Sequence, residues 1–187
     1  TFIKLLLKEL NPTEGTIVVD NVNLSKLKSR GTAKYRRKVG VVFQDFRLLQ
    51  DRDVYSNIAF AQRVIGVSTR EIKKNVPRML SLVGLSEKYK SFPNELSGGE
   101  QQRVAIARAI SHSPKIIFAD EPTAELDSPT AMAVMKLFRD LVRQNDLTIV
   151  MTTHDTTMMD LADIVYTLED GVISDVKENQ PEEGADA

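Results

Sequence analysis

Apolar residues follow two patterns along the chain, short continuous runs and longer stretches with helical spacing. Three runs are almost wholly apolar and predict buried strands, and they span residues 39–43, 116–119 and 148–151. Helical spacing recurs in three other segments, at residues 2–10, 53–84 and 128–142. Apolar strands that alternate with amphipathic helices predict an α/β fold, in which a mostly parallel sheet is covered by helices on both faces.

Polar residues mark where the predicted helices begin and end. The Asn-Pro pair at 11–12 is expected to stop the first helix. Segment 68–71 has the Ser-x-x-Glu spacing of a capping box, and Pro77 predicts a kink or a restart within the helix that follows. Ser128 is predicted as the N-cap of the next long helix, with Pro129 at its first position.

Shorter segments predict the remaining strands. Residues 16–19 form a short predicted strand, whereas 164–168 and 172–176 flank a Glu-Asp-Gly turn and predict a hairpin at the edge of the sheet. Residues 177–187 are predicted to be a flexible acidic tail, because they carry too little apolar surface to offset the entropy of ordering them.

Composition narrows the class of protein. The 187 residues are 42% hydrophobic and 27% charged, with 25 Lys and Arg against 26 Asp and Glu and no Cys. These values fit one domain with a sizeable core and argue against a disulfide scaffold, a thiolate metal site and a wholly basic nucleic-acid binder. Segment 26–38 carries seven basic residues and no acid, and we interpret it as a solvated face rather than an anion site.

Candidate chemistry lies where the predicted strands end. Gln44, Asp120, Glu121 and His154 follow three of the strands, and ligands of open α/β sheets bind at that edge. An acidic pair in this position can hold Mg²⁺ through one carboxylate and activate water through the other. The same pair can instead cap a turn fixed by the following proline. Gln44 and His154 taken alone fit hydrogen-bonded turn residues equally well.

A second candidate site begins the helix after residue 96. Ser97 and Glu100 have the capping-box spacing, so they can serve only to start the helix. However, Gly98 and Gly99 leave backbone N–H groups bare at the positive end of the helix dipole, which is how a phosphate is held. The Ser97 hydroxyl adds a further donor.

Taken together, these motifs resemble those of the ATP-binding subunits of ABC transporters, and the similarity covers nearly all of the chain before the tail. Five segments carry the resemblance: 96–101 resembles the signature motif, 116–121 the Walker B strand with its catalytic Glu, 124–127 the D-loop, Gln44 the Q-loop and His154 the switch histidine. The resemblance implies a P-loop NTPase-type sheet with an inserted helical subdomain. It divides the chain into a RecA-like core at 1–52 and 97–176, a helical subdomain at 53–96 and the tail at 177–187.

For such a protein, the resemblance implies a homodimer that encloses two ATP molecules with Mg²⁺. Each nucleotide is expected to lie between the phosphate loop of one copy and the signature motif of the other. The implied catalytic residues are Glu121 as base, His154 and Gln44. The implied nucleotide-binding residues are Thr1, Ser97, Gly98, Gly99, Gln101 and Asp127. The implied metal ligands are Asp120 and Gln44.

The phosphate loop of this family, G-x-x-G-x-G-K-[ST], does not occur in the sequence. Segment 2–10 resembles the helix that follows this loop, and Thr1 resembles the hydroxyl residue after its Lys-Ser pair. We therefore expect the loop and its strand to lie upstream of Thr1, and the 187-residue chain alone not to hydrolyse ATP. Ala124 and Glu125 replace a common Gly-Asn pair, and we expect no loss of function from this difference.

Within the family, segments 43–49 and 53–60 resemble those of the bacterial cell-division ATPases. The lipoprotein-release and macrolide-export ATPases share much of the same pattern and are the alternative. Both groups imply an integral membrane, permease-like partner and a peripheral location on the cytoplasmic face of the membrane. Phe46, Leu48 and Leu49 are expected either to line the partner's docking groove or to be buried in the core.

A third class, the chromosome-maintenance and DNA-repair ATPases, carries related motifs but inserts coiled coils or zinc modules between them. The interval between Gln44 and Ser97 is short and contains no heptads and no Cys. We therefore expect no nucleic-acid partner.

Overall fold

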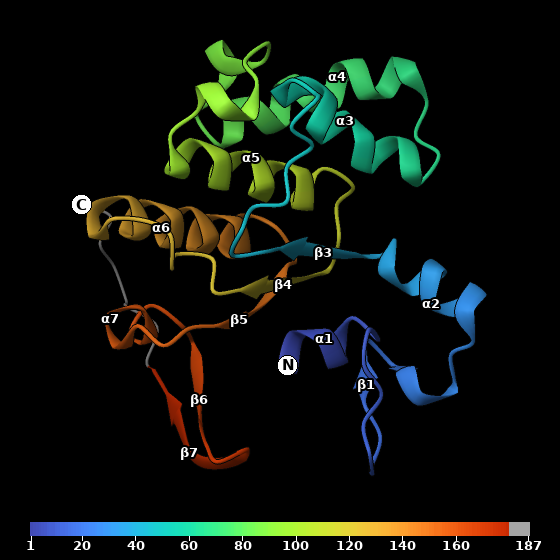
Figure 1. The fold of residues 1–187 in the computed structure, drawn as a ribbon, viewed down its shortest axis with the longest axis vertical. Helices are drawn as coiled ribbons and strands as arrows, with labels where there is room; N and C mark the ends of the chain where they lie inside the picture. Colours follow the sequence, from blue (N-terminus) through green and yellow to red (C-terminus); the bar gives the residue numbers. More distant parts are fainter. Residues whose placement is uncertain (180–187) are drawn as a thin grey trace. The chain divides into compact units, whose positions relative to one another are not determined.

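The computed structural model describes residues 1–179 and separates the chain into two compact units, Thr1–Thr152 and a second unit that begins at Thr153. The centre of the first unit is a three-stranded sheet in the order β3-β4-β5. Its strands are β3 (Val39–Val42), β4 (Ile116–Asp120) and β5 (Thr148–Thr152). All three run parallel, with Val42 beside Ala119 and Asp120 beside Thr152, so their carboxyl ends meet at one edge (Figure 1). The α/β fold with a parallel sheet is thereby confirmed.

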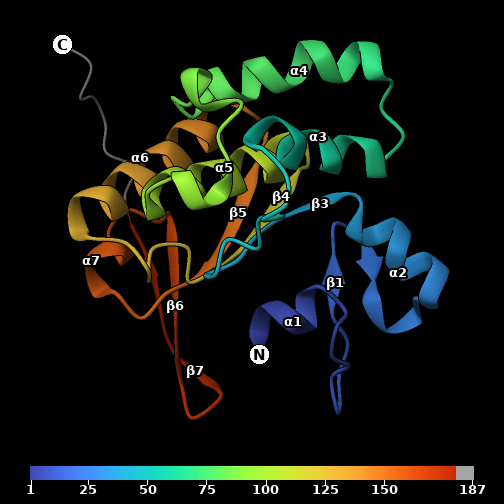
Figure 2. The same ribbon diagram turned by 45° about the horizontal axis from the view of Figure 1, so that its top comes forward.

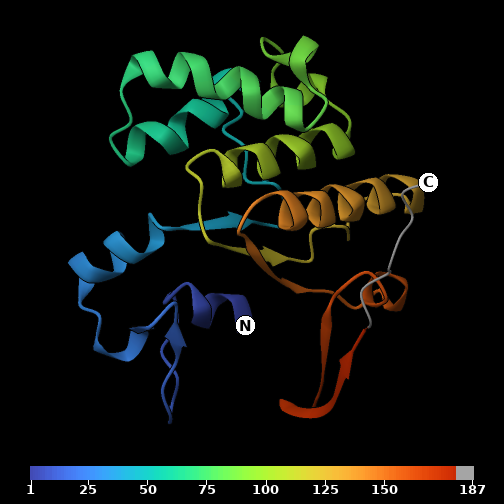
Figure 3. The ribbon, with the colours of Figure 1, turned by 180° about the vertical axis from the view of Figure 1, so that it is seen from behind.

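Helices cover both faces of this sheet. On one face lie α5 (Gly98–Ile110) and α6 (Ser128–Gln144), whereas α1 (Phe2–Leu6) lies on the other, as Figure 1 and the reverse view in Figure 3 show. The C-terminal end of α5 rests directly on β3 at Gly40. A β-carbon at Gly40 would lie 2.8 Å from the Ala109 carbonyl oxygen, so only glycine permits this close approach.

A helical layer lies on the outer side of α5, away from the sheet (Figure 2). It consists of α3 (Val54–Val64) and α4 (Thr69–Leu82), followed by single 3₁₀ turns at Ser86–Lys88 and Pro93–Glu95. The predicted capping box of Ser68 and Glu71 is present. Pro77 lies inside α4 without dividing it, so the predicted restart is wrong. The core between these helices and α5 includes Leu48, Val54, Ile58, Ile72, Val76, Leu80, Val104 and Ala105.

A second core lies under the opposite face of the sheet. It includes Ile3, Leu7, Val19, Leu24, Tyr35, Val39 and Phe118. The elements around it are α1, β1 (Val18–Val19), β2 (Val22–Asn23), a 3₁₀ turn at Leu24–Lys26 and α2 (Ser29–Arg36). Strands β1 and β2 pair antiparallel. Strand β1 lies within the predicted strand at 16–19, whereas β2 follows it and was not predicted.

Helix α1 is shorter than the prediction of residues 2–10. Lys8 adopts a left-handed conformation with φ of 58°, and its N–H donates to the Leu5 carbonyl. The next N–H, from Glu9, reaches back to the Lys4 carbonyl at 2.8 Å. This pair of bonds is a Schellman motif, which ends the helix before the Asn-Pro pair at 11–12 is reached.

The N-cap of α6 also differs from the prediction by one residue. Asp127, not Ser128, caps the helix, because its Oδ1 accepts a hydrogen bond of 2.9 Å from the Thr130 N–H. Ser128 and Pro129 therefore occupy the first two helical positions. Both residue types at 127 and 128 are good caps, so the local sequence did not separate them.

The second unit contains α7 (Thr156–Met159) and the predicted hairpin, formed by β6 (Ile164–Glu169) and β7 (Val172–Glu178). The two strands pair antiparallel as a separate two-stranded sheet, so the hairpin itself is confirmed but its predicted pairing at the edge of the main sheet is wrong. Lys177 and Glu178, predicted as the start of the tail, belong to β7, and the predicted tail from Gln180 onward lies outside the described residues. Among residues 1–179, no helix has the length and apolar character needed to cross a membrane.

Candidate functional site

The acidic pair predicted from the sequence lies at the carboxyl end of β4. Asp120 is the last residue of the strand, and the Thr152 hydroxyl donates a 2.8 Å hydrogen bond to its Oδ1. The Glu121 N–H in turn donates to the Thr152 carbonyl at 3.1 Å. The end of β5 therefore fixes both the carboxylate of Asp120 and the backbone of Glu121.

Glu121 occupies a left-handed conformation with φ of 48°, which is disfavoured for residues other than glycine. The turn that holds it is supported from α5, because the amide nitrogen of Gln102 donates to the Pro122 carbonyl. Gln102 is fully buried. A residue held in such a conformation by its surroundings is typical of functional sites.

Gln44 reaches the same edge of the sheet from the loop after β3. Its Nε2 donates to Oε1 of Glu125 at 3.0 Å, and both side chains are exposed. The structure thus brings Gln44 to the segment that follows the acidic pair, 81 residues further along the chain.

The helix α5 begins with the predicted capping box. Ser97 Oγ accepts from the Glu100 N–H at 3.3 Å, and Glu100 Oε2 accepts from the Ser97 N–H at 2.9 Å. The bond from Ser97, and an ion pair of 3.2 Å with Lys88, hold the pKa of the Glu100 carboxyl below its ordinary value. Gln101 turns its amide to the Leu96 carbonyl at 3.2 Å, so its side chain supports the same turn.

The first turns of α5 and α6 are in direct contact. A β-carbon at Gly99 would lie 2.3 Å from Cγ2 of Thr130, whereas one at Gly98 would lie 3.6 Å from Leu126. Asp127 accepts from both the N–H and the hydroxyl of Thr130, and these bonds lower the pKa of its carboxyl. The segments predicted as signature motif and D-loop are therefore neighbours within one chain.

The oxygen donors at this edge suit Mg²⁺. Among residues 1–179, no group of three or more His, Cys, Asp or Glu side chains is gathered as a ready metal cage. Mg²⁺ is usually held by one or two carboxylates, with the remaining positions filled by water and substrate phosphates. One oxygen of Asp120 is bound to Thr152, which orients the carboxylate and leaves its other oxygen for such a role.

Two of the predicted site residues belong to neither the loops after β3 and β4 nor the first turns of α5 and α6. His154 belongs to the second unit, just after β5. Thr1 is the N-cap residue of α1, and its hydroxyl makes no capping bond there.

Sequence reasoning missed three residues that support the site. Thr152 and Gln102 hold the turn at Glu121, and Arg108 binds the loop after Gln44 through two backbone carbonyls. Thr152 had a usable signal, because a hydroxyl at the end of a parallel strand faces the end of the next strand. Gln102 and Arg108 had none, because their partners are 20 and at least 61 residues away.

A groove of about 530 Å³ lies beside the loop after Gln44. Its apolar lining includes Val41, Phe43, Leu49, Phe60, Val64 and Ile65, and its basic lining includes Arg36, Arg37, Arg47 and Arg108. Leu49 therefore belongs to this groove. Leu48 is 7% exposed and packs in the helical core with Phe46 against it, so of the two roles expected for it, burial in the core is the one that the structure shows.

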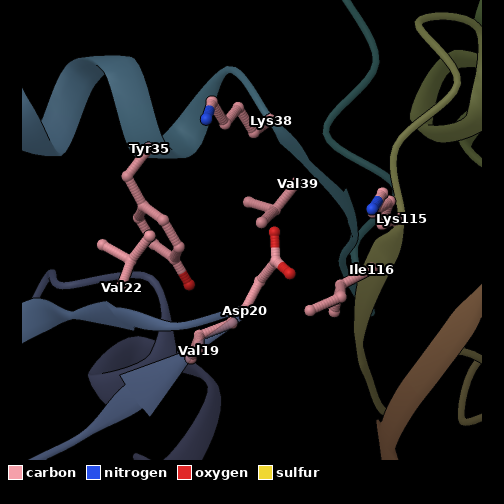
Figure 4. Close-up of a pocket in the computed structure, with 8 residues that line it drawn as sticks. All are labelled: Val19, Asp20, Val22, Tyr35, Lys38, Val39, Lys115 and Ile116. Carbon is pink, nitrogen blue, oxygen red and sulfur yellow. The ribbon is translucent and has the colours of Figure 1, made fainter.

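A second hollow lies at the opposite end of the sheet, where β3 and β4 begin. Figure 4 shows it between Tyr35, Val39 and Ile116, with Asp20, Lys38 and Lys115 close by. Its volume is about 20 Å³, enough for a water molecule but not for a nucleotide.

The folded sheet, the acidic pair at its carboxyl edge and the glycine-led helix beside that pair are shared with a known class of ATPases. Residues 1–124 match the ABC transporter family, and the chain belongs to that family. It is therefore the ATP-binding, ATP-hydrolysing type of subunit.

Within this class, the chain is 47% identical over 172 residues to the cell division ATP-binding protein FtsE of Streptococcus pneumoniae, covering 91% of this chain and 74% of that protein. It is 40% identical to the methionine import ATP-binding protein MetN of Helicobacter hepaticus, covering 92% of this chain and 50% of that protein. The methionine importers were not among the alternatives that the sequence suggested.

A solved structure, the dimeric ATP-binding cassette MJ0796 in a post-hydrolysis state with ADP and phosphate bound, superposes with a TM-score of 0.86 at 32% identity. The superposition covers 96% of this chain and 80% of that one.

Proposed function

We propose that this chain is the ATPase of a bacterial cell-division complex of the FtsE type, with the integral membrane protein FtsX as its partner. The observation that carries the proposal is the 44–48% identity to FtsE proteins over 86–92% of the chain, against 40–41% to methionine importers over 86–92% of the chain and 45% to another over 77% of it. In this proposal ATP hydrolysis regulates cell-wall hydrolysis at the septum, and no solute is moved. The protein acts at the cytoplasmic face of the cell membrane, held there by its partner.

In the proposed active form, two copies enclose two ATP molecules. The N–H groups of Gly98 and Gly99 precede the first intrahelical hydrogen bonds of α5 and can bind phosphate oxygens, whereas those of Ser97 and Glu100 are taken by the capping box. The Ser97 hydroxyl can still donate to a phosphate, which supports a role for Ser97, Gly98 and Gly99. A helix N-terminus cannot alone surround a triphosphate, so the phosphate loop of the other copy supplies the rest. Gln101 supports this turn through Leu96, and Asp127 couples the two sites by holding the adjacent turn of α6. Thr1 is proposed to lie beside the phosphate loop of its own copy.

The proposed chemistry rests on the turn after β4. Glu121 accepts a proton from the water that attacks the γ-phosphate, and His154 stabilises the charge on that phosphate. Asp120 and Gln44 would hold Mg²⁺, whose charge neutralises the phosphate oxygens when it is bound. The bonds from Thr152 and Gln102 keep the two carboxyl residues in place, which matters because catalysis of this kind depends mainly on positioning.

The groove beside the Gln44 loop is the proposed docking site for the membrane subunit. Its apolar lining includes residues that remain accessible, since Phe60 is 42% and Val64 is 45% exposed. Arginines around it suit a partner segment with one apolar and one acidic face. Arg47 belongs to the loop after Gln44, and Arg108 binds the carbonyls of that loop. Because both arginines line the groove, an occupant there can influence the nucleotide site.

The proposal is tested in the bacterium that carries the gene. Deletion of the gene is expected to block cell separation, and the phenotype should be rescued by the wild-type gene but not by a gene carrying Glu121→Gln. The natural gene product should also co-purify with an FtsX-type membrane protein. Normal division combined with loss of methionine uptake would assign the chain to an importer instead. Co-purification with a lipoprotein-release or macrolide-export permease would favour the alternative suggested by the sequence.

A further inference from the structure

The loop after Gln44 has an unusual backbone. Phe46 and Arg47 are consecutive residues with φ of 58° and 46°, so both lie in the left-handed region although neither is glycine. Such conformations are disfavoured by contacts of the β-carbon and persist only where the surroundings impose them. The loop therefore needs contacts from outside itself to keep this shape.

Asn57 holds the later part of the loop through the N–H and carbonyl of Leu49, and Phe46 packs against the helical core. At the two left-handed residues themselves, the hydrogen bonds from outside the loop come from one side chain near the end of α5. Arg108 Nη1 donates to the Arg47 carbonyl at 2.6 Å, and Nη2 donates to the Phe46 carbonyl at 2.8 Å. The two acceptors are the carbonyls of the two left-handed residues. The planar guanidinium carries its donors in a fixed arrangement, so it can hold two neighbouring carbonyls in one geometry.

Arg108 depends on these carbonyls in return. Burial lowers the pKa of its guanidinium, and within the described residues no ion pair joins it to a carboxylate. Arg108 is half-buried at the edge of the groove, and a charge partly withdrawn from water is costly unless it is hydrogen-bonded. The loop carbonyls are therefore the groups that satisfy it, and the two partners stabilise one another.

The helix that carries Arg108 begins at the signature motif. Arg108 lies ten positions after Gly98, which is about 15 Å along a helix. The loop also reaches the beginning of this helix, because a β-carbon at Gly98 would lie 4.0 Å from Cζ of Phe46. The loop thus contacts α5 near both of its ends.

We propose that Arg108 is a positioning residue that fixes the Gln44 loop to the signature helix, so that Gln44 and Ser97–Gly99 keep a set relation during the ATPase cycle. The proposal rests on the proposed function for its effect on catalysis, but the contact itself does not. Arg108 acts through the backbone of the loop that begins at Gln44.

The first test follows the loop directly by hydrogen exchange in the natural gene product. Arg108→Gln is expected to speed exchange of amides in residues 45–50 at least about tenfold, because two charge-assisted bonds are lost. In Arg108→Lys the exchange rate should lie between those of Arg108→Gln and wild type, since an ammonium cannot bind both loop carbonyls as a guanidinium does. Arg78→Gln, an exposed position on α4, is the matched control and should change nothing. Unchanged exchange in Arg108→Gln would overturn the proposal.

The second test is kinetic and uses the same variants. Arg108→Gln is expected to lower kcat about tenfold or more and to raise the Mg²⁺ concentration needed for half-maximal rate, with partial recovery in Arg108→Lys. A purely structural role would reduce the active fraction alone, leaving the Mg²⁺ dependence unchanged, and that outcome would overturn the proposal. Normal kinetics despite faster loop exchange would also overturn it. If Glu121→Gln hydrolyses ATP normally, by contrast, it is the proposed function that fails, whereas the exchange test of Arg108 still holds.

Discussion

The side-chain amide of Gln44 donates a 3.0 Å hydrogen bond to the carboxylate of Glu125. Gln44 is the residue proposed to meet Mg²⁺ and water, so in this conformation a neighbour in the same chain occupies its amide nitrogen. The bond must open, or the amide must offer its oxygen alone, before Gln44 can take up both roles. Glu125 gives this contact a carboxylate acceptor.

Glu125→Ala is therefore expected to free Gln44 and to lower the Mg²⁺ concentration for half-maximal hydrolysis about two- to tenfold, the range expected for one exposed hydrogen bond. Gln44→Ala should raise that concentration. The double variant should behave like Gln44→Ala alone, because Glu125 acts through Gln44. Independent, additive effects of the two substitutions in steady-state kinetics would show that the contact has no part in catalysis.

Replacement of the proposed base is expected to separate binding from hydrolysis. Glu121→Gln should lower kcat by about 10²–10⁴-fold while ATP still binds, because the amide cannot accept the proton. The ATP-bound dimer should then accumulate and be visible by light scattering after gel filtration. Glu87→Gln, an exposed carboxylate in the turn after α4, is the control and should turn over normally. Near-normal hydrolysis by Glu121→Gln would remove that residue from the role of base.

The two glycines at the start of α5 are expected to differ sharply in their tolerance of a methyl group. Gly99→Ala places a β-carbon 2.3 Å from Thr130 and should destabilise the fold by about 1–3 kcal/mol. Gly98→Ala meets nothing closer than 3.6 Å and should be nearly neutral in stability. Urea unfolding measures both.

Thr130→Ser supplies the control for this pair, because it removes the methyl group that clashes but keeps the hydroxyl bonded to Asp127. It should restore most of the stability lost in Gly99→Ala. Equal stability of the two alanine variants would contradict the packing described between α5 and α6.

The pKa of Glu100 gives a pH dependence with a defined sign. Its carboxyl has a lowered pKa in the folded state, so its stabilising contribution is complete above the unfolded value of about 4.3 and is lost as pH falls through the folded value. The free energy of unfolding should therefore drop below about pH 4.5 more steeply in wild type than in Glu100→Gln. At pH 7 the variant should be less stable by about 0.5–1 kcal/mol. Parallel pH profiles would show that the capping box does not titrate in this way.

The docking groove predicts which apolar substitutions affect the membrane partner. Val64→Glu should abolish co-purification with the partner, because it places a charge on an exposed apolar residue of the groove. ATP binding should remain intact, because Val64 lies on α3 and not in the segment of the acidic pair. Leu82→Glu, at a similarly exposed residue on α4 outside the groove lining, should retain the partner. Leu48→Glu should instead unfold the helical layer, since Leu48 is buried there. Retention of the partner by Val64→Glu would remove the groove from the interface.

Local sequence patterns were sufficient for the parts of the fold that depend on local physics. The apolar runs at 39–43, 116–119 and 148–151 became parallel strands, and the Ser68–Glu71 capping box formed as spaced. The placement of Gln44 and the acidic pair at one sheet edge followed from parallel strands alone. The roles of these residues in catalysis remain predictions.

Patterns failed where a distant residue decides the outcome. For Leu48 the sequence left docking and burial open, and only its packing against helices further along the chain decides for the core. The bond from Gln102 to Pro122 and the contacts of Arg108 likewise join segments with no shared local signal. The early end of α1 depends on one left-handed residue, Lys8, whose type gives no hint of that conformation.

The position of α5 against β3 at Gly40 has a consequence for protein engineering. Helix α5 is bound closely to the core at Gly40 and Gly99, yet Val104, Ala105 and Ala107 on the same helix pack against α3 and α4. A chimera that takes residues 53–96 from a relative must therefore import matching side chains at 104, 105 and 107 while keeping both glycines. The boundary for such an exchange therefore runs along α5, between the side that packs on the sheet and α6 and the side that packs on α3 and α4. It does not coincide with a break between two segments of the chain.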